Sequence, residues 1–250
     1  MNKNQELKMK LLDKFCQSND INGINLCREA YKFLNEDDSN LCETTNVANR
    51  FVDDEGLPIV GAYIETIDGR LFTANEWKDC GMDNKEANCV TVTNGIKAVR
   101  VALQEGGKLN IHSSHDGKLE KYMSAMIDVD DAENDFNGVE NTKNILKFND
   151  GDEYAAGFCN IILLPDNKTK CHLPSLGEMR LIRFYKKQVQ KCLSACGGVL
   201  LQNELYWTST FGGVFDDGFR PCWAINWLDN EVRRLFLDIK VMVRPVAAYA

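Results

Sequence analysis

The stretch HLPSLGEMRLIRFYKKQVQKCLSACGG, His172 to Gly198, decides the predicted fold. Ser175 and Glu178 have the S-x-x-E spacing of a capping box, which predicts that a helix begins after Ser175. Apolar residues then recur at helical spacing: Leu176, Met179, Ile182 and Val189. The pair Gly197-Gly198 predicts the end of this helix, because glycine readily adopts the left-handed conformation that closes helices.

Four short strand-like runs follow the helix, separated by Gly, Asp and Asn turn residues. They are YWTST (206–210), CWAINWL (222–228), EVRRLFLDI (231–239) and VMVRPVAAY (241–249). Trp207 and Trp223 lie inside such runs, so we expect them in the core. The carboxyl-terminal third is therefore predicted to be a helix followed by a compact antiparallel sheet.

Two hairpin signals precede the helix. Asp68-Gly69 and Asn94-Gly95 each separate runs of alternating apolar residues, which is typical of two-residue β-turns. Thr73 and Glu76 form a second capping box, which predicts a short helix after the first hairpin. This part of the chain is expected to be rich in locally paired strands.

Residues 1–50 are predicted to form two short amphipathic helices around a turn at 19–23. Their apolar residues are Leu7, Leu11, Leu12, Phe15, Ile24, Leu26, Cys27, Tyr31 and Leu34. Two such helices enclose little core on their own, so we expect them to pack on the rest of the chain or on another subunit. Their expected role is attachment or oligomerisation. The amino terminus lacks the apolar core of a secretory signal, and no run approaches the roughly 20 apolar residues of a membrane helix.

The chain of 250 residues has 29 basic and 37 acidic side chains, a net charge of −8. An acidic balance argues against nucleic acid as a partner. Residues 126–153 hold nine acids and two lysines and are expected to be a solvated acidic loop. The D-x-D start at Asp128 does not make an EF-hand, because Glu133 replaces the required glycine and Val139 the acid at the twelfth position.

The ten cysteines contain no C-x-x-C pair, so a structural zinc site is not predicted and free thiols are favoured. Cys192 and Cys196 are interpreted as small apolar residues on a buried helix face. His112 and His115 are expected in an exposed loop, and His172 at a strand end. Because no nucleophile, phosphate-loop, dinucleotide or metalloprotease motif is present, we expect neither an enzyme nor a cofactor.

The aromatic residues are concentrated near the carboxyl terminus: eight of 23 lie in residues 206–236. Phe211, Phe215, Phe219 and Arg220 belong to a loop rich in glycine and aspartate, which is difficult to bury completely. Exposed aromatic side chains with arginine on a rigid sheet are typical of binding hot spots. The alternative is that this loop folds back and covers the core.

Several of these motifs, in this order, resemble a known module. They are DGRLFTANEW (68–77), DFNGVENTKNI (135–145), AAGFCN (155–160), LPSLGE (173–178), YWTST (206–210) and VRPV (243–246). Over residues 55–250 the chain resembles the C-type-lectin-like module of phage and gut-bacterial surface proteins. That module includes the variable proteins of diversity-generating retroelements and is related in fold to the formylglycine-generating enzymes.

The resemblance implies an α+β, C-type-lectin-like fold with short antiparallel sheets over residues 51–250, preceded by the helical segment 1–50. Physically, the arginine of VRPV, Arg244, is expected to satisfy buried carbonyls or an acid and to lock the final strand. The resemblance places the ligand-facing positions between YWTST and VRPV: Phe211, Phe215, Phe219, Arg220, Trp227, Asp229, Arg233, Arg234 and Phe236. The EPN and QPD triplets of calcium-dependent lectins are absent, so no metal is expected.

The resemblance further implies a non-enzymatic recognition protein, either a phage receptor-binding protein or a retroelement variable protein. Its expected partner is a cell-surface protein or glycan, without nucleic acid or membrane insertion. The amino-terminal helices are expected to contact virion subunits or to form a homo-oligomer. The expected location is the virion, after synthesis in the host cytoplasm, with a cytoplasmic protein as the alternative. A structural head or tail component is the alternative function.

Overall fold

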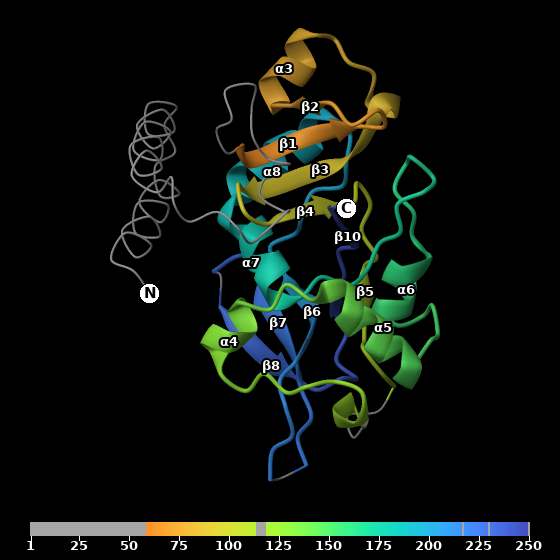
Figure 1. Cartoon of the computed structure of the whole chain (residues 1–250), viewed down its shortest axis with the longest axis vertical. Coiled ribbons are helices and arrows are strands. Elements are labelled where there is room, and N and C mark those ends of the chain that lie inside the picture. The colour runs from red at the N-terminus through yellow and green to blue at the C-terminus, as the bar shows by residue number, and fades with distance from the viewer. Residues whose placement is uncertain (1–58, 114–118, 217, 230, 250) are drawn as a thin grey trace, which may run out of the picture. The chain divides into compact units, whose positions relative to one another are not determined.

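The computed structural model describes residues 59–113, 119–216, 218–229 and 231–249 (Figure 1). Residues 61–92 and 98–250 belong to one compact unit, which holds most of the described residues. The predicted helical segment 1–50 lies outside the described residues. The fold described below is mixed α+β, with short helices and two sheets of short strands.

The first sheet has the strand order β10-β4-β3-β1-β2. Its strands are β1 (Val60–Thr66), β2 (Leu71–Phe72), β3 (Ala87–Asn94), β4 (Ala98–Val101) and β10 (Val246–Ala248). Both predicted hairpin turns are confirmed, with Gly69 at φ 87° and Gly95 at φ 83°, in the left-handed region that glycine favours.

The second sheet has the order β5-β9-β6-β7-β8. Its strands are β5 (Lys108–Leu109), β6 (Leu205–Phe211), β7 (Cys222–Asn226), β8 (Val232–Leu235) and β9 (Val241–Met242). The predicted all-antiparallel carboxyl-terminal sheet is wrong in two respects. β6 pairs with β9 in parallel, and β10 leaves this sheet to pair with β4 of the first. Turn residues specify local hairpins, whereas these pairings join segments far apart in sequence.

Helices connect and cover the strands. They are α3 (Ala74–Asp79), the 3₁₀ turns η1 (Asn84–Glu86) and η2 (Leu119–Lys121), α4 (Val129–Glu133), α5 (Gly138–Phe148), α6 (Ala155–Ile161), α7 (Leu176–Phe184) and α8 (Lys186–Ala195). Both predicted capping boxes are present, at Thr73 and at Ser175. The single helix predicted after Ser175 is two helices, because the backbone of Tyr185 (φ −92°, ψ 24°) departs from α-helical values.

The acidic region differs from the solvated loop that we predicted. It contains α4 and α5, and Asp135 between them is only 2% exposed. The Asp135 carboxylate accepts hydrogen bonds from the Thr210 hydroxyl (2.6 Å), the Asn141 amide (2.7 Å) and the Asn137 backbone N–H (2.9 Å). This carboxylate therefore helps to hold the start of α5 against β6.

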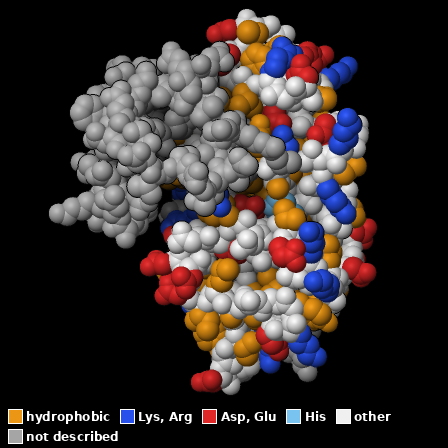
Figure 2. Space-filling model, in the orientation of Figure 1, with side chains coloured by type: hydrophobic (Ala, Val, Ile, Leu, Met, Phe, Trp, Pro, Cys, Tyr) orange, Lys and Arg blue, Asp and Glu red, His pale blue; other side chains and the backbone are white. Residues whose placement is uncertain are grey.

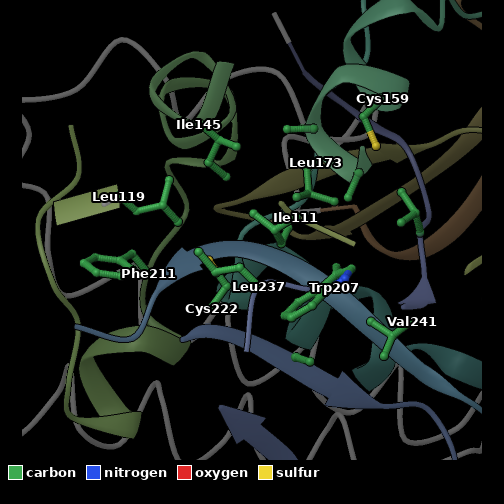
Figure 3. Packing of buried hydrophobic residues seen from close by; sticks show 14 of the residues in the cluster. Ile111, Leu119, Ile145, Cys159, Leu173, Trp207, Phe211, Cys222, Leu237 and Val241 are labelled. Carbon is green, nitrogen blue, oxygen red and sulfur yellow. The ribbon is translucent and has the colours of Figure 1, made fainter. Parts of the chain in front are cut away.

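The main hydrophobic cluster lies between α5, α6 and the second sheet (Figure 3). Trp207 of β6 is a fully buried member of this cluster, and its indole N–H donates to the carbonyl of Leu109 (2.9 Å). Ile145 of α5 and Leu173, which precedes α7, belong to the same cluster. Trp223 of β7 is 4% exposed, so both tryptophans are core residues, as predicted.

The final turn before β10 is fastened by Arg244, as expected. Its buried guanidinium donates to the carbonyls of Ala102 (3.1 Å), Gln104 (3.1 Å) and Val199 (2.8 Å). It also pairs with the carboxylate of Glu105 (3.1 Å). One side chain thus joins the segment after β4 to the segment after α8.

Candidate recognition surface

The connection between β6 and β7 carries the first group of predicted site residues. It closes as a tight turn in which the Phe215 N–H donates to the Phe219 carbonyl and the Gly218 N–H to the Phe215 carbonyl, both at 2.9 Å. At its base the Gly212 N–H donates to the Pro221 carbonyl (2.8 Å). Gly218 has φ 84°, a conformation that glycine adopts without steric cost. The described residues of this connection are therefore joined by backbone hydrogen bonds.

Three phenylalanine rings contact one another beside this turn. The centre of the Phe219 ring lies 5.6 Å from that of Phe215 and 4.4 Å from that of Phe236, the latter at an interplanar angle of 63°. Phe236 follows β8 and is 43% exposed. Such edge-to-face contacts stabilise aromatic clusters beyond simple burial. The trio therefore combines residues from two separate connections of the second sheet.

Arg234 lies beside the trio. The register pairs it with Trp223 across β7 and β8, and its guanidinium carbon lies 4.5 Å from the centre of the Trp223 ring. The same carbon lies 4.9 Å from the centre of the Phe215 ring. The guanidinium also donates to the carbonyl of Ile127. Cation–π contacts with two rings hold this cation in place.

A segment remote in sequence, 125–127, completes this surface. The Trp223 indole N–H donates to the Met126 carbonyl (2.8 Å), and the Met126 N–H donates to the Phe211 carbonyl (2.9 Å). Gly213 allows a close approach, since a Cβ atom there would lie 2.8 Å from Cγ1 of Ile127. Ile127 itself is 51% exposed. The sequence did not predict the role of this segment, because no local pattern indicates that Met126 contacts Trp223, almost 100 residues later in the chain.

We call the resulting surface the aromatic patch, defined as Ile127, Val214, Phe215, Phe219, Arg234 and Phe236. Figure 2 shows hydrophobic side chains exposed among charged ones in the lower half of the view, where Figure 1 places β7 and β8. Arg220 lies at the edge of the patch and pairs with Glu120 (3.2 Å) while donating to the Gly218 carbonyl (2.8 Å).

Two of the nine predicted ligand-facing residues are buried instead. Phe211 is 1% exposed and belongs to the main hydrophobic cluster. Trp227 is fully buried, with its ring 6.1 Å from that of Tyr206 and beneath the cationic groups of Arg183 and Lys186, both 5.6 Å away. Both side chains are therefore core residues. The prediction failed because glycine turns interrupt the sequence, so evenly spaced aromatic residues need not share one surface.

Asp229 and Arg233 are exposed but do not join the aromatic patch. Asp229 stabilises the β7–β8 turn by accepting from the Glu231 N–H (3.0 Å) and the Asn226 side-chain amide (3.1 Å). Arg233 forms an ion pair with Glu231. Side chains alternate along a strand, so Arg233 and Arg234 lie on opposite faces of β8. The structure therefore brings together Phe215, Phe219, Arg220, Arg234 and Phe236.

Most of the described cysteines are buried in the core. Among the described cysteines, Cys80 is exposed and six are buried: Cys89, Cys159, Cys171, Cys192, Cys196 and Cys222. Burial raises the pKa of Cys192 to about 12 and also raises that of Cys196, which fits their interpretation as core residues. In the part of the chain that the structure describes, no three His, Cys, Asp or Glu side chains are placed to hold a metal ion.

The two described histidines agree with the predictions in part. His172, predicted at a strand end, bridges to Val246, but its side chain is buried and lies 3.1 Å from the carboxylate of Glu178. His112 is half-buried rather than fully exposed, with its ring 4.5 Å from that of Phe148 and 6.1 Å from that of Tyr154. His115 lies outside the described residues.

Comparison with known proteins gives no relative: no family model, no curated protein and no solved structure matches the chain. None of the described helices has the length and apolar character required to cross a membrane.

Proposed function

We propose that this chain is a non-enzymatic recognition protein of C-type-lectin-like fold that binds a cell-surface protein or glycan through the aromatic patch. In this proposal it is a phage receptor-binding protein or a variable protein of a diversity-generating retroelement. The motif order from DGRLFTANEW to VRPV supports the lectin-like assignment. The observation that carries the binding function is the Phe215–Phe219–Phe236 cluster with Arg234, in which Phe236 is 43% exposed and the other three side chains are half-buried.

Burial energetics support this use of the patch. Exposed aromatic side chains in contact with water are unfavourable, and covering them with a partner stabilises the complex by about 25 cal/mol per Å² of apolar area. Aromatic residues and arginine are also the residue types most enriched at binding hot spots. The backbone hydrogen bonds from Phe215 to Phe219 and from Gly218 to Phe215 hold these three residues together in advance, which lowers the entropy lost on binding.

The test uses the purified, fluorescently labelled full chain and a panel of intact gut anaerobes, measured by flow cytometry. We expect labelling of at least one strain, lost in the double variant Phe219→Ser/Phe236→Ser. The matched control is Ile161→Ser, which changes an exposed apolar residue (58%) on α6. Failure of the wild type to label any strain, or equal labelling by the double variant, would contradict the proposal.

A structural virion component is the second candidate, because an apolar patch with fixed geometry is also suited to packing against a neighbouring subunit. Sedimentation of the purified chain distinguishes the two. Self-association that is abolished by Phe219→Ser/Phe236→Ser, without binding to cells, would favour the structural role.

A further inference from the structure

We infer that the aromatic patch selects a polypeptide segment carrying an apolar side chain next to a carboxylate, rather than a glycan. This inference rests on the proposed function and narrows its two partner classes to one.

The first argument is the lack of polar groups on the aromatic patch. Five of its six side chains are hydrocarbon only, namely Ile127, Val214, Phe215, Phe219 and Phe236. A sugar that covers these side chains removes hydroxyl groups from water, and each hydroxyl then needs a hydrogen-bond partner. Phenylalanine has neither the hydroxyl of tyrosine nor the indole N–H of tryptophan to supply one. An aliphatic or aromatic side chain of a protein has no such requirement.

The second argument is that the polar groups beside the patch are already used within the chain. The Trp223 indole N–H donates to Met126, so it is not available to a ligand. Arg220 donates to Glu120 and to the carbonyl of Gly218. Redirecting these donors to sugar hydroxyls would break internal hydrogen bonds for little net gain.

The third argument is charge. Arg220 and Arg233 each form an ion pair with a glutamate, Glu120 and Glu231. Among the described residues Arg234 forms no ion pair, its Nη2 donates to the Ile127 carbonyl and its Nε is buried, which leaves Nη1 as the donor for a ligand. This guanidinium lies against the Phe215 ring at the border of the hydrocarbon surface. A carboxylate on the partner would complement this charge, and charge-assisted hydrogen bonds to arginine are among the stronger ones.

The hydrocarbon surface and the Arg234 guanidinium lie side by side on the patch. A ligand that fits both needs an apolar side chain over the phenylalanine trio and, next to it, a carboxylate at Arg234. A short peptide with a large apolar residue flanked by Asp or Glu satisfies both. A neutral glycan satisfies neither.

The experiment selects ligands for the immobilised full chain from a displayed library of random 12-residue peptides, with a glycan array probed in parallel. We expect enriched peptides that contain Phe, Trp, Leu or Ile beside Asp or Glu. A synthetic consensus peptide should bind Phe236→Ser and Arg234→Gln each about tenfold more weakly than the wild type. The control Arg233→Gln, on the opposite face of β8, should bind within about twofold of the wild type. Circular dichroism and thermal unfolding establish that each variant is folded.

A double-mutant cycle isolates the charge contact. Replacing the peptide acid by its amide should weaken binding to the wild type but not to Arg234→Gln. Equal weakening of both would overturn the acidic part of the inference. Patch-dependent binding to a glycan without any patch-dependent peptide would overturn the inference and leave the proposed function intact. If neither class of ligand depends on the patch, the proposed function fails as well. Patch-dependent self-association would identify a second copy as the partner and also overturn the inference.

Discussion

The guanidinium of Arg244 donates a hydrogen bond to the carbonyl of Ala102, 3.1 Å away and 142 residues earlier in the chain. The same side chain also satisfies the carbonyls of Gln104 and Val199 and pairs with Glu105. Lysine cannot reproduce this planar arrangement of donors. We expect Arg244→Lys to lower the free energy of unfolding by about 2–3 kcal/mol. Urea denaturation measures this loss.

The control for Arg244 is Arg233→Lys, because Arg233 is exposed and its ion pair among the described residues is with Glu231, two residues away. We expect this variant to lie within about 0.5 kcal/mol of the wild type. Equal effects of the two replacements would show that Arg244 does not fasten the final turn.

The two capping boxes offer a matched comparison. Ser175 is buried, and its hydroxyl accepts from the Glu178 N–H and donates to the carbonyl of Asp135 (2.6 Å). The corresponding hydroxyl of Thr73 lies on the surface and caps only α3. We expect Ser175→Ala to lower the free energy of unfolding by about 2 kcal/mol and Thr73→Ala by about 1 kcal/mol or less. A larger loss for Thr73→Ala, measured in urea, would contradict this assignment.

Thiol reactivity should separate the exposed cysteine from the buried ones. Burial raises the pKa of Cys171 and of Cys192 to about 12, so both remain protonated at pH 8 and are shielded from reagents. We expect N-ethylmaleimide to modify Cys80 in the native protein and to reach Cys171 and Cys192 only after denaturation. Peptide mass spectrometry over time makes the measurement. Native-state labelling of Cys192 as fast as that of Cys80 would refute the placement of α8.

Asp166 should make stability depend on pH. Partial burial tends to raise its pKa, but hydrogen bonds from Thr169 and Lys168 outweigh this effect and hold the pKa below its ordinary value. Because the folded-state pKa is the lower one, the carboxylate stabilises the fold above the unfolded pKa near about 4. This stabilisation is lost as pH falls through the folded-state pKa.

The variant Asp166→Asn removes this dependence. We expect the wild type to be more stable than Asp166→Asn at neutral pH and the difference to shrink on acidification below about pH 4. Urea denaturation at several pH values measures the difference. Asp150→Asn, at an exposed position, is the control for the loss of one negative charge. A difference that grows on acidification would contradict the assigned direction.

Local signals in the sequence predicted local structure well. The turns at Asp68-Gly69 and Asn94-Gly95, the capping boxes at Thr73 and Ser175, and the burial of Trp207 and Trp223 all agree with the structure. Each depends on interactions between residues close in the chain or on a strong preference of one side chain for burial. The resemblance to the lectin-like module and the function drawn from it stay predictions.

The candidate surface was predicted only in part. Phe215, Phe219, Arg220, Arg234 and Phe236 come together, but Phe211 and Trp227 are buried and Ile127 was missed. Spacing alone does not reveal which face of an irregular connection is covered. That depends on what packs against it, here the 125–127 segment and α7 with α8.

The sequence by itself determined the mixed α+β class, the positions of the turns and helix starts, and the concentration of aromatic residues near the carboxyl terminus. The fold class, turns and helix starts follow from backbone preferences and hydrophobic periodicity, which act over a few residues, and the aromatic concentration is read directly from the sequence. Only the tertiary structure decided that β6 and β9 run in parallel, that β10 joins the first sheet, and that Arg244 links segments over 140 residues apart. It also decided which aromatic rings face solvent, because exposure depends on contacts between segments distant in the chain.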